Sequence, residues 1–103
     1  MREPVLAAAD VDAALEEQQL RWTREGDELR ATVKLRDFAG ALAFVNAVGA
    51  AAEAANHHPD IDIRWNTVHL VLTTHDSGGI TVLDLALAAA IDRLRPAPRA
   101  DES

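Results

Sequence analysis

The segment Ile61–Leu72, IDIRWNTVHLVL, decides the fold because apolar and polar side chains alternate along both of its halves. A period of two is typical of half-buried β-strands, and Asn66-Thr67 between the halves predicts a two-residue turn. We therefore expect an antiparallel hairpin in which apolar residues of the two strands pair on one face. A one-residue slip of the register would destroy this apolar pairing. In this register the paired residues are Trp65 with Val68, Ile63 with Leu70, and Ile61 with Leu72.

A second hairpin is expected earlier in the chain. Leu20–Glu25 and Leu29–Arg36 both alternate apolar with polar residues, and Gly26-Asp27 between them supplies a turn. Trp22, in the first of these strands, is expected in the core, as is Trp65. Two hairpins predict a four-stranded antiparallel sheet.

Three helices complete the predicted order α-β-β-α-β-β-α. The first spans residues 10–19 with Asp10 as N-cap, and the second runs from the cap Asp37 to about Ala55, because Pro59 bars its continuation. The third runs to about residue 94 and begins with the capping box Thr81-x-x-Asp84. The fold class is α+β, with the three helices packed on one face of the sheet. Apolar residues on several sides of the third helix suggest a partner subunit.

Composition limits the possible functions of these 103 residues. The net charge is -7, from 10 Lys and Arg against 17 Asp and Glu, which argues against nucleic-acid or membrane partners. The absence of cysteine excludes disulfides and thiolate zinc sites. No signal peptide is visible near Met1, and no apolar stretch approaches the ~20 residues that span a bilayer. We expect a cytoplasmic protein with one domain, residues 1–95, and a disordered tail, residues 96–103.

The hairpin register brings together three of the four histidines. Continued outward, it places Asp60 opposite Thr73 and His58 opposite His75, although Pro59 interrupts the ladder. His57 joins them along the chain, and Glu53 lies one helical turn before it, at the i, i+4 spacing. His69 stands roughly 20 Å away along the strand, so it does not belong to the cluster.

The cluster His57/His58/His75 with Glu53 leaves three interpretations open. It is a metal site, a set of polar edge residues satisfied by water and backbone, or a general acid–base site. Neighbouring histidines rarely aim at one ion, and the spacing fits no standard zinc pattern. Several groups that titrate near neutral pH suit simultaneous proton donation and removal, which favours the acid–base interpretation.

A hydrolase triad of Ser77, His75 and Asp84 is disfavoured. No strand–turn–helix nucleophile elbow surrounds the serine, and Asp84 already has a structural explanation as the N3 partner of the Thr81 cap.

The spacing Glu53-x3-His57-His58-Pro59, followed by Trp65, His75 and Asp84, resembles the signature of the pterin-4a-carbinolamine dehydratases. The resemblance extends through Trp22 and the segments Lys34–Phe38 (KLRDF) and Thr74–Thr81 (THDSGGIT). Only the first few residues and the C-terminal tail fall outside it.

The resemblance implies an enzyme that dehydrates 4a-hydroxytetrahydropterin to quinonoid dihydropterin in tetrahydrobiopterin recycling. It implies a homodimer or homotetramer that needs no metal and no cofactor. The catalytic residues that it implies are His57, His58 and His75, supported by Glu53 and Asp84. The residues that it implies around the pterin substrate are Asn56, His57, His58, Thr73, Thr74, His75 and Asp76.

The individual roles stay a hypothesis at this point. One of His57 and His58 is the base that takes the N5 proton, and His75 is the acid for the departing hydroxyl. Relatives of the family also serve as non-enzymatic dimerisation or assembly cofactors on the same fold. The intact histidine set favours catalysis over that alternative.

Overall fold

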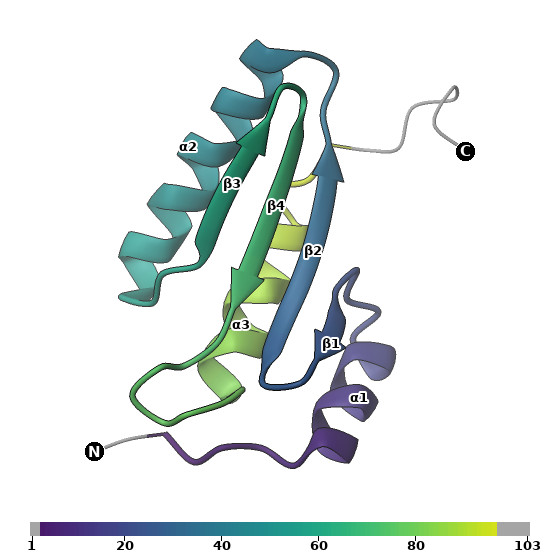
Figure 1. Cartoon of the computed structure of the whole chain (residues 1–103), viewed down its shortest axis with the longest axis vertical. Helices are drawn as coiled ribbons and strands as arrows, with labels where there is room; N and C mark the ends of the chain where they lie inside the picture. Colours follow the sequence, from purple (N-terminus) through teal and green to yellow (C-terminus); the bar gives the residue numbers. More distant parts are fainter. Residues whose placement is uncertain (1–2, 97–103) are drawn as a thin grey trace.

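The computed structural model describes residues 3–96, which form a four-stranded antiparallel sheet and three helices in the predicted order (Figure 1). The strand order across the sheet is β1-β2-β4-β3. The bounds are α1 Ala8–Glu17, β1 Thr23–Glu25, β2 Glu28–Lys34, α2 Phe38–Ala55, β3 Asp60–Arg64, β4 Thr67–Leu72 and α3 Val82–Asp92. The predicted disordered tail lies, from residue 97 onward, outside the described residues.

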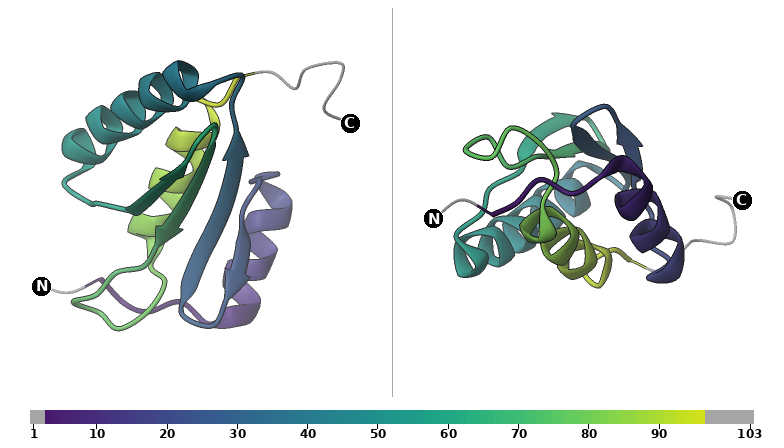
Figure 2. Two further views of the ribbon diagram at one scale, coloured as in Figure 1. Left: turned by 45° about the horizontal axis from the view of Figure 1, so that its top comes forward. Right: turned by 90° about the horizontal axis from the view of Figure 1, so that it is seen from below.

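The helices cover one face of the sheet, as predicted (Figure 2). Alternation along β2 and β4 turns their apolar side chains, except that of Val71, toward the helices and their polar ones to the open face. Helix α3 packs against both α1 and α2, which explains within one chain why it is apolar on several sides. The strand residues buried beneath the helices are Leu29, Ala31, Val33, Val68, Leu70 and Leu72.

The β3–β4 hairpin differs from the predicted register by two residues. Ile63 pairs with Val68 and Arg64 with Thr67, so the turn is Trp65-Asn66 and not Asn66-Thr67. A shift of two residues keeps every side chain on its original face, because the side-chain period of a strand is two. The apolar match between the strands is therefore preserved although the predicted pairs are wrong.

The turn residues explain the observed register. Asn66 is buried, and its Nδ2 donates to the carbonyl of Leu35 at 3.1 Å, while the N–H of Leu35 donates to the Asn66 carbonyl at 2.7 Å. These bonds tie the hairpin tip to the chain that leaves β2. Trp65 has a φ of 54° at the first turn position, a conformation that such two-residue hairpin turns require. Its side chain is 68% exposed, so the prediction that Trp65 belongs to the core is wrong.

The helix ends follow the predicted caps with one exception. Asp37 accepts the N–H of Gly40 at 2.7 Å, and the Thr81 capping box is complete. Helix α1, in contrast, begins after Ala7, which makes no side-chain cap, and the predicted N-cap Asp10 lies inside its first turn. An acidic residue there still interacts favourably with the helix dipole.

Helix α2 corrects the expectation that no segment is apolar enough to cross a membrane. Its 18 residues have a mean hydropathy of 1.5, and by length and composition alone they qualify as a candidate span. Alanine supplies much of this hydropathy, and α2 packs on the sheet through Ala41, Phe44, Val48 and Ala52. The core side of a packed helix accounts for part of its apolar character.

The environments of the two tryptophans lead to a prediction in fluorescence. Trp22 is 5% exposed and its Nε1 donates to Asp92 Oδ1 at 2.9 Å, whereas Trp65 stands in water. The Trp65→Phe variant should emit at shorter wavelength and resist iodide quenching. The matched Trp22→Phe variant should emit at longer wavelength and be quenched readily. Equal quenching of the two variants would contradict this arrangement.

Candidate functional site

A pocket of about 220 Å³ opens between the C-terminal end of α2 and the loop that follows β4. Its lining residues are those that the sequence analysis placed around a ligand: Asn56, His57, His58, Thr73, Thr74, His75 and Asp76. The structure therefore brings the three predicted histidines to one place. It does not by itself assign a role to any of them.

The end of α2 explains how two adjacent histidines reach one pocket. Asn56 adopts a left-handed conformation with a φ of 50°, and the N–H of His57 donates to the carbonyl of Ala52 at 3.1 Å. A left-handed residue ends a helix by turning the chain away from its axis. The pair His57-His58 then lies between the last residue of α2 and the first residue of β3.

The predicted opposition of His58 and His75 needs correction. Because β3 and β4 pair Asp60 with Val71, continuing this register sets His58 level with Thr73. His75 is then level with Asn56. His58 and His75 nevertheless line the same pocket.

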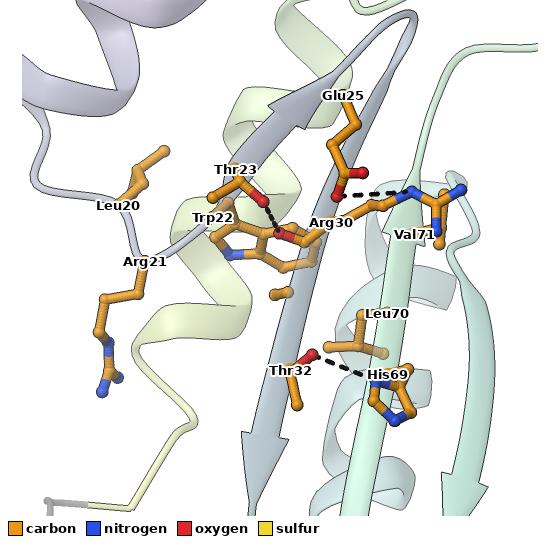
Figure 3. A pocket seen from close by; sticks show the side chains of 11 residues that line it. Leu20, Arg21, Trp22, Thr23, Glu25, Arg30, Thr32, His69, Leu70 and Val71 are labelled. Carbon is orange, nitrogen blue, oxygen red and sulfur yellow. Dashed lines mark hydrogen bonds and ion pairs between the residues drawn. The ribbon is translucent and has the colours of Figure 1, made fainter.

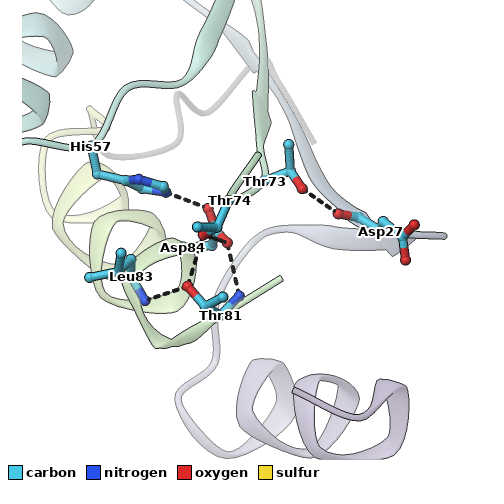
Figure 4. Close-up of polar contacts among 7 residues, drawn as sticks. All are labelled: Asp27, His57, Thr73, Thr74, Thr81, Leu83 and Asp84. Atoms are coloured by element: carbon cyan, nitrogen blue, oxygen red, sulfur yellow. Dashed lines mark hydrogen bonds and ion pairs between the residues drawn. The ribbon is translucent and has the colours of Figure 1, made fainter. Parts of the chain in front are cut away.

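A buried carboxylate lies beneath His57 (Figure 4). Asp84, in the first turn of α3, is 0% exposed, and its Oδ1 lies 2.6 Å from His57 Nε2. Its Oδ2 accepts from the Thr74 hydroxyl at 2.7 Å and from the N–H of Thr81 at 2.9 Å. A buried carboxylate needs such partners because transfer out of water is costly for an unpaired charge.

Hydrogen-bond donors and acceptors fix the direction of this network. The N–H of Leu83 donates to Thr81 Oγ1 at 3.2 Å. Because the Thr74 hydroxyl donates its proton to Asp84, the Thr81 hydroxyl must be the donor in the 2.8 Å bond between Thr81 Oγ1 and Thr74 Oγ1. An ionised carboxylate only accepts, so we assign the proton between Asp84 and His57 to Nε2 of the ring. That assignment leaves Nδ1 as the nitrogen of His57 that is free to accept a proton.

Glu53 contacts His58 and not His57, contrary to the expectation from the i, i+4 spacing. His58 Nε2 is hydrogen-bonded to Glu53 Oε2, and the two side chains are 57% and 78% exposed. The His57 side chain, in contrast, is only 12% exposed. The two neighbouring histidines thus each have a carboxylate partner, one buried and one in water.

Two other interpretations of these residues find no support in the geometry. Ser77 Oγ donates to the carbonyl of Glu3 at 2.6 Å and Asp84 is bonded to His57, so the hydrolase triad is not assembled. Within residues 3–96, no group of three or more His, Cys, Asp and Glu side chains is placed to hold a metal ion.

His69 lies apart from the other histidines, as predicted. A larger cavity of about 550 Å³ borders β1, β2 and β4, and there His69 Nδ1 is 3.1 Å from the Thr32 hydroxyl (Figure 3). His69 is the only histidine among the residues that line this cavity. Size alone therefore does not locate the chemistry, because the smaller pocket holds the cluster of titratable groups.

The Thr81–Asp84 capping box was predicted, but the sequence analysis missed that Thr74 also holds Asp84. A signal was available in the alternation of β4, where Val68, Leu70 and Leu72 face the core. Thr74 continues the same parity beyond the end of the strand, and a hydroxyl on an apolar face requires a buried partner.

Comparisons with known proteins agree with this fold and site. Residues 4–94 match the model of the family described as pterin 4 alpha carbinolamine dehydratase. A protein of Chloroflexus aurantiacus named "Putative pterin-4-alpha-carbinolamine dehydratase" is 52% identical over 91 residues, which cover 88% of this chain and 97% of that protein. A protein of the same name from Roseiflexus castenholzii is 52% identical over 92 residues, covering 86% and 99%.

Two solved structures share the fold. A transcriptional coactivator/pterin dehydratase from Brucella melitensis superimposes with a TM-score of 0.83 at 26% identity, covering 89% of this chain and 99% of that one. A pterin dehydratase-like protein identified as a RuBisCO assembly factor in the alpha-carboxysome gives a TM-score of 0.61 at 24% identity, covering 77% and 92%. The second likeness concerns the fold alone.

The two histidine–carboxylate pairs should differ sharply in their effect on stability. Asp84→Ala leaves buried donors without an acceptor, so we expect the free energy of unfolding to fall by about 3 kcal/mol. Glu53→Ala breaks an exposed pair and should cost less than about 1 kcal/mol. Urea denaturation at pH 7 measures both variants, and equal losses would contradict the buried network.

Proposed function

Because the chain belongs to the pterin 4 alpha carbinolamine dehydratase family, we propose that it dehydrates a 4a-hydroxytetrahydropterin to the quinonoid dihydropterin. The observation that carries this proposal is the pocket in which His57, His58 and His75 meet above the buried Asp84. We place the reaction in tetrahydrobiopterin recycling, where the product is reduced again. The proposed mechanism uses side chains only, without metal or cofactor.

The reaction requires an acid and a base on the same substrate. The C4a–O bond breaks and the hydroxyl leaves as water after it receives a proton. The N5–H bond is broken by the base, and its electron pair forms the C4a=N5 double bond. Two groups that act together in this way contribute a rate factor of about 10²–10⁴.

We propose His57 as the base, acting through Nδ1. Its Nε2 proton is held by Asp84, so the ring has one orientation and a carboxylate is ready to stabilise the imidazolium when N5 gives up its proton. A buried carboxylate that orients a histidine base in this way is familiar from other proton-transfer sites. The proposal favours His57 over His58, a choice that the sequence left open.

His75 supplies the acid in this proposal. It is exposed at the rim of the pocket and so reaches the substrate from the loop that follows β4, whereas the His57-His58 pair follows α2. His58, with Glu53 beside it, is proposed to bind and orient the pterin at the water-facing edge. The three side chains then have separate tasks, which substitution can distinguish.

Stopped-flow absorbance of the carbinolamine provides the test. His57→Ala and His75→Ala should each lower the dehydration rate constant about 10²-fold, because each removes a proton-transfer group. Asp84→Asn should also lower the rate constant, because an amide has only one acceptor oxygen and cannot serve His57, Thr74 and Thr81 as the carboxylate does.

His69→Ala is the matched control, because His69 lies in the other cavity and should keep the full rate. Full activity in both His57→Ala and His75→Ala would overturn the assignment of base and acid.

A non-enzymatic assembly or dimerisation role is the alternative on the same fold. It is raised by the relatives named as a coactivator and as an assembly factor. Calorimetry with a dihydropterin separates the two: an enzyme should bind the ligand with measurable heat, and His58→Ala should weaken that binding. A pure scaffold would show no heat.

Self-association is a further part of the proposal. Phe38 and Leu42 on α2 are 49% and 42% exposed, and a second copy of the chain would cover such apolar side chains. Light scattering after gel filtration should give the mass of a dimer or tetramer. Leu42→Glu should shift the measured mass toward the 11.1 kDa of the monomer. A wild-type mass of 11.1 kDa would refute self-association. A cytoplasmic location without nucleic-acid or membrane partners stays a prediction.

A further inference from the structure

The loop that carries His75 is closed upon itself. Thr74 and Gly79 form an isolated antiparallel bridge, in which the N–H of Thr74 donates to the Gly79 carbonyl at 3.0 Å. The carbonyl of Thr74 also accepts from the N–H groups of Ser77 at 3.0 Å and Gly78 at 2.9 Å. His75 and Asp76 project from the resulting turn and are both exposed at the pocket. The position of His75 therefore depends on what holds this turn.

The N-terminal segment Glu3–Leu6 lies directly against the other side of that turn. Ser77 Oγ donates to the Glu3 carbonyl at 2.6 Å, and the N–H of Leu6 donates to the Ile80 carbonyl at 2.9 Å. In Figures 1 and 2 the chain near the N-terminus passes beside the loop between β4 and α3. The two hydrogen bonds thus hold the turn at both ends of the stretch from Ser77 to Ile80.

Gly79 allows this close approach. A Cβ at position 79 would lie 2.9 Å from Val5 Cγ1 and 3.5 Å from Val5 Cγ2, and the former distance is shorter than atoms tolerate. The φ of Gly79 is not in the left-handed region, so its backbone accepts alanine and only Val5 stands in the way. Within the described chain, the lack of a side chain at Gly79 is explained by the segment that packs on it.

We propose that Glu3–Leu6 is a positioning segment for His75, which holds the turn Thr74–Gly79 so that the acid faces the pterin. The inference rests on the proposed function, because His75 is the acid of that reaction. Glu3–Leu6 does not line the pocket of about 220 Å³ and acts only through the loop. Residues outside the site thereby determine the geometry of one of its catalytic groups.

The steric fit of Val5 on Gly79 provides the test. Gly79→Ala should push the segment off the turn and lower kcat about tenfold, since small misplacements of a catalytic group cost up to about 10²-fold in rate. Adding Val5→Ala removes both Cγ atoms and leaves the Val5 Cβ at 3.8 Å, an ordinary contact. The double variant should therefore recover to within about twofold of wild type.

Gly49→Ala is the matched control, because a Cβ at position 49 in α2 meets nothing within 4 Å. Its kcat should equal that of the wild type. A loss of rate in this control as large as that in Gly79→Ala would overturn the proposal, because the effect would then be general to glycine replacement.

NMR of the His75 Cε1–Hε1 group gives a readout independent of turnover. Its cross-peak should shift or broaden in Gly79→Ala and return in the double variant. Suppose that neither the wild type nor the variants dehydrate the pterin, although the cross-peak shifts in Gly79→Ala and returns in the double variant. In that case the proposed function fails, but the role of Glu3–Leu6 as a positioning segment stands. A wild-type cross-peak in Gly79→Ala, or no recovery when Val5→Ala is added, overturns the positioning segment.

Ser77→Ala covers the case in which Gly79→Ala does not fold. It removes one donor without adding an atom, and it breaks the bond to the Glu3 carbonyl. The His75 cross-peak should shift in the same direction as for Gly79→Ala. An unchanged cross-peak in Ser77→Ala would again overturn the proposal.

Discussion

The buried carboxylate of Asp84 is the constraint that connects the fold with the candidate site. It caps α3 through the N–H of Thr81, receives the hydroxyl of Thr74 beyond β4, and holds His57 at the end of α2. Because an unpaired buried charge is costly, the three segments that supply these partners must converge. The hydrogen bonds that satisfy the Asp84 carboxylate thereby fix the start of α3, the loop after β4 and the ring of His57 relative to one another.

The two neighbouring histidines show how one short sequence provides two chemically different groups. The left-handed Asn56 turns the chain at the end of α2, after which His57 points inward and His58 outward. His57 meets a carboxylate that cannot move, since Asp84 is held by α3. His58 meets the exposed Glu53, whose side chain can reorient in water. Burial, rather than residue type, separates a fixed group from an adaptable one.

Local rules predicted much of the fold and the meeting of His57, His58 and His75, whereas the wider set of site residues was implied by the resemblance to a family. The alternation of apolar and polar residues located the strands, and the caps Asp37 and Thr81 located the starts of two helices. The apolar face of the hairpin was predicted correctly in spite of the register error, because the error was an even number of residues. Local rules could not place the β3–β4 turn. Its position depends on Asn66 bonding to the Leu35 backbone, a contact between segments that are distant in sequence. The same contact leaves the Trp65 side chain exposed to water, although its hydrophobicity alone had predicted a place in the core.

The sequence by itself determined which residues could do chemistry and roughly where they meet, because strand parity and helix breakers are local properties of the chain. Only the tertiary structure decided how they pair. The i, i+4 spacing pointed Glu53 to His57, yet Asp84 takes that histidine from a helix that lies 27 residues further along. The contact of Glu3–Leu6 with the His75 loop is likewise invisible to periodicity. Pairings of this kind depend on burial and on the packing of distant segments, and those arise only when the chain has folded.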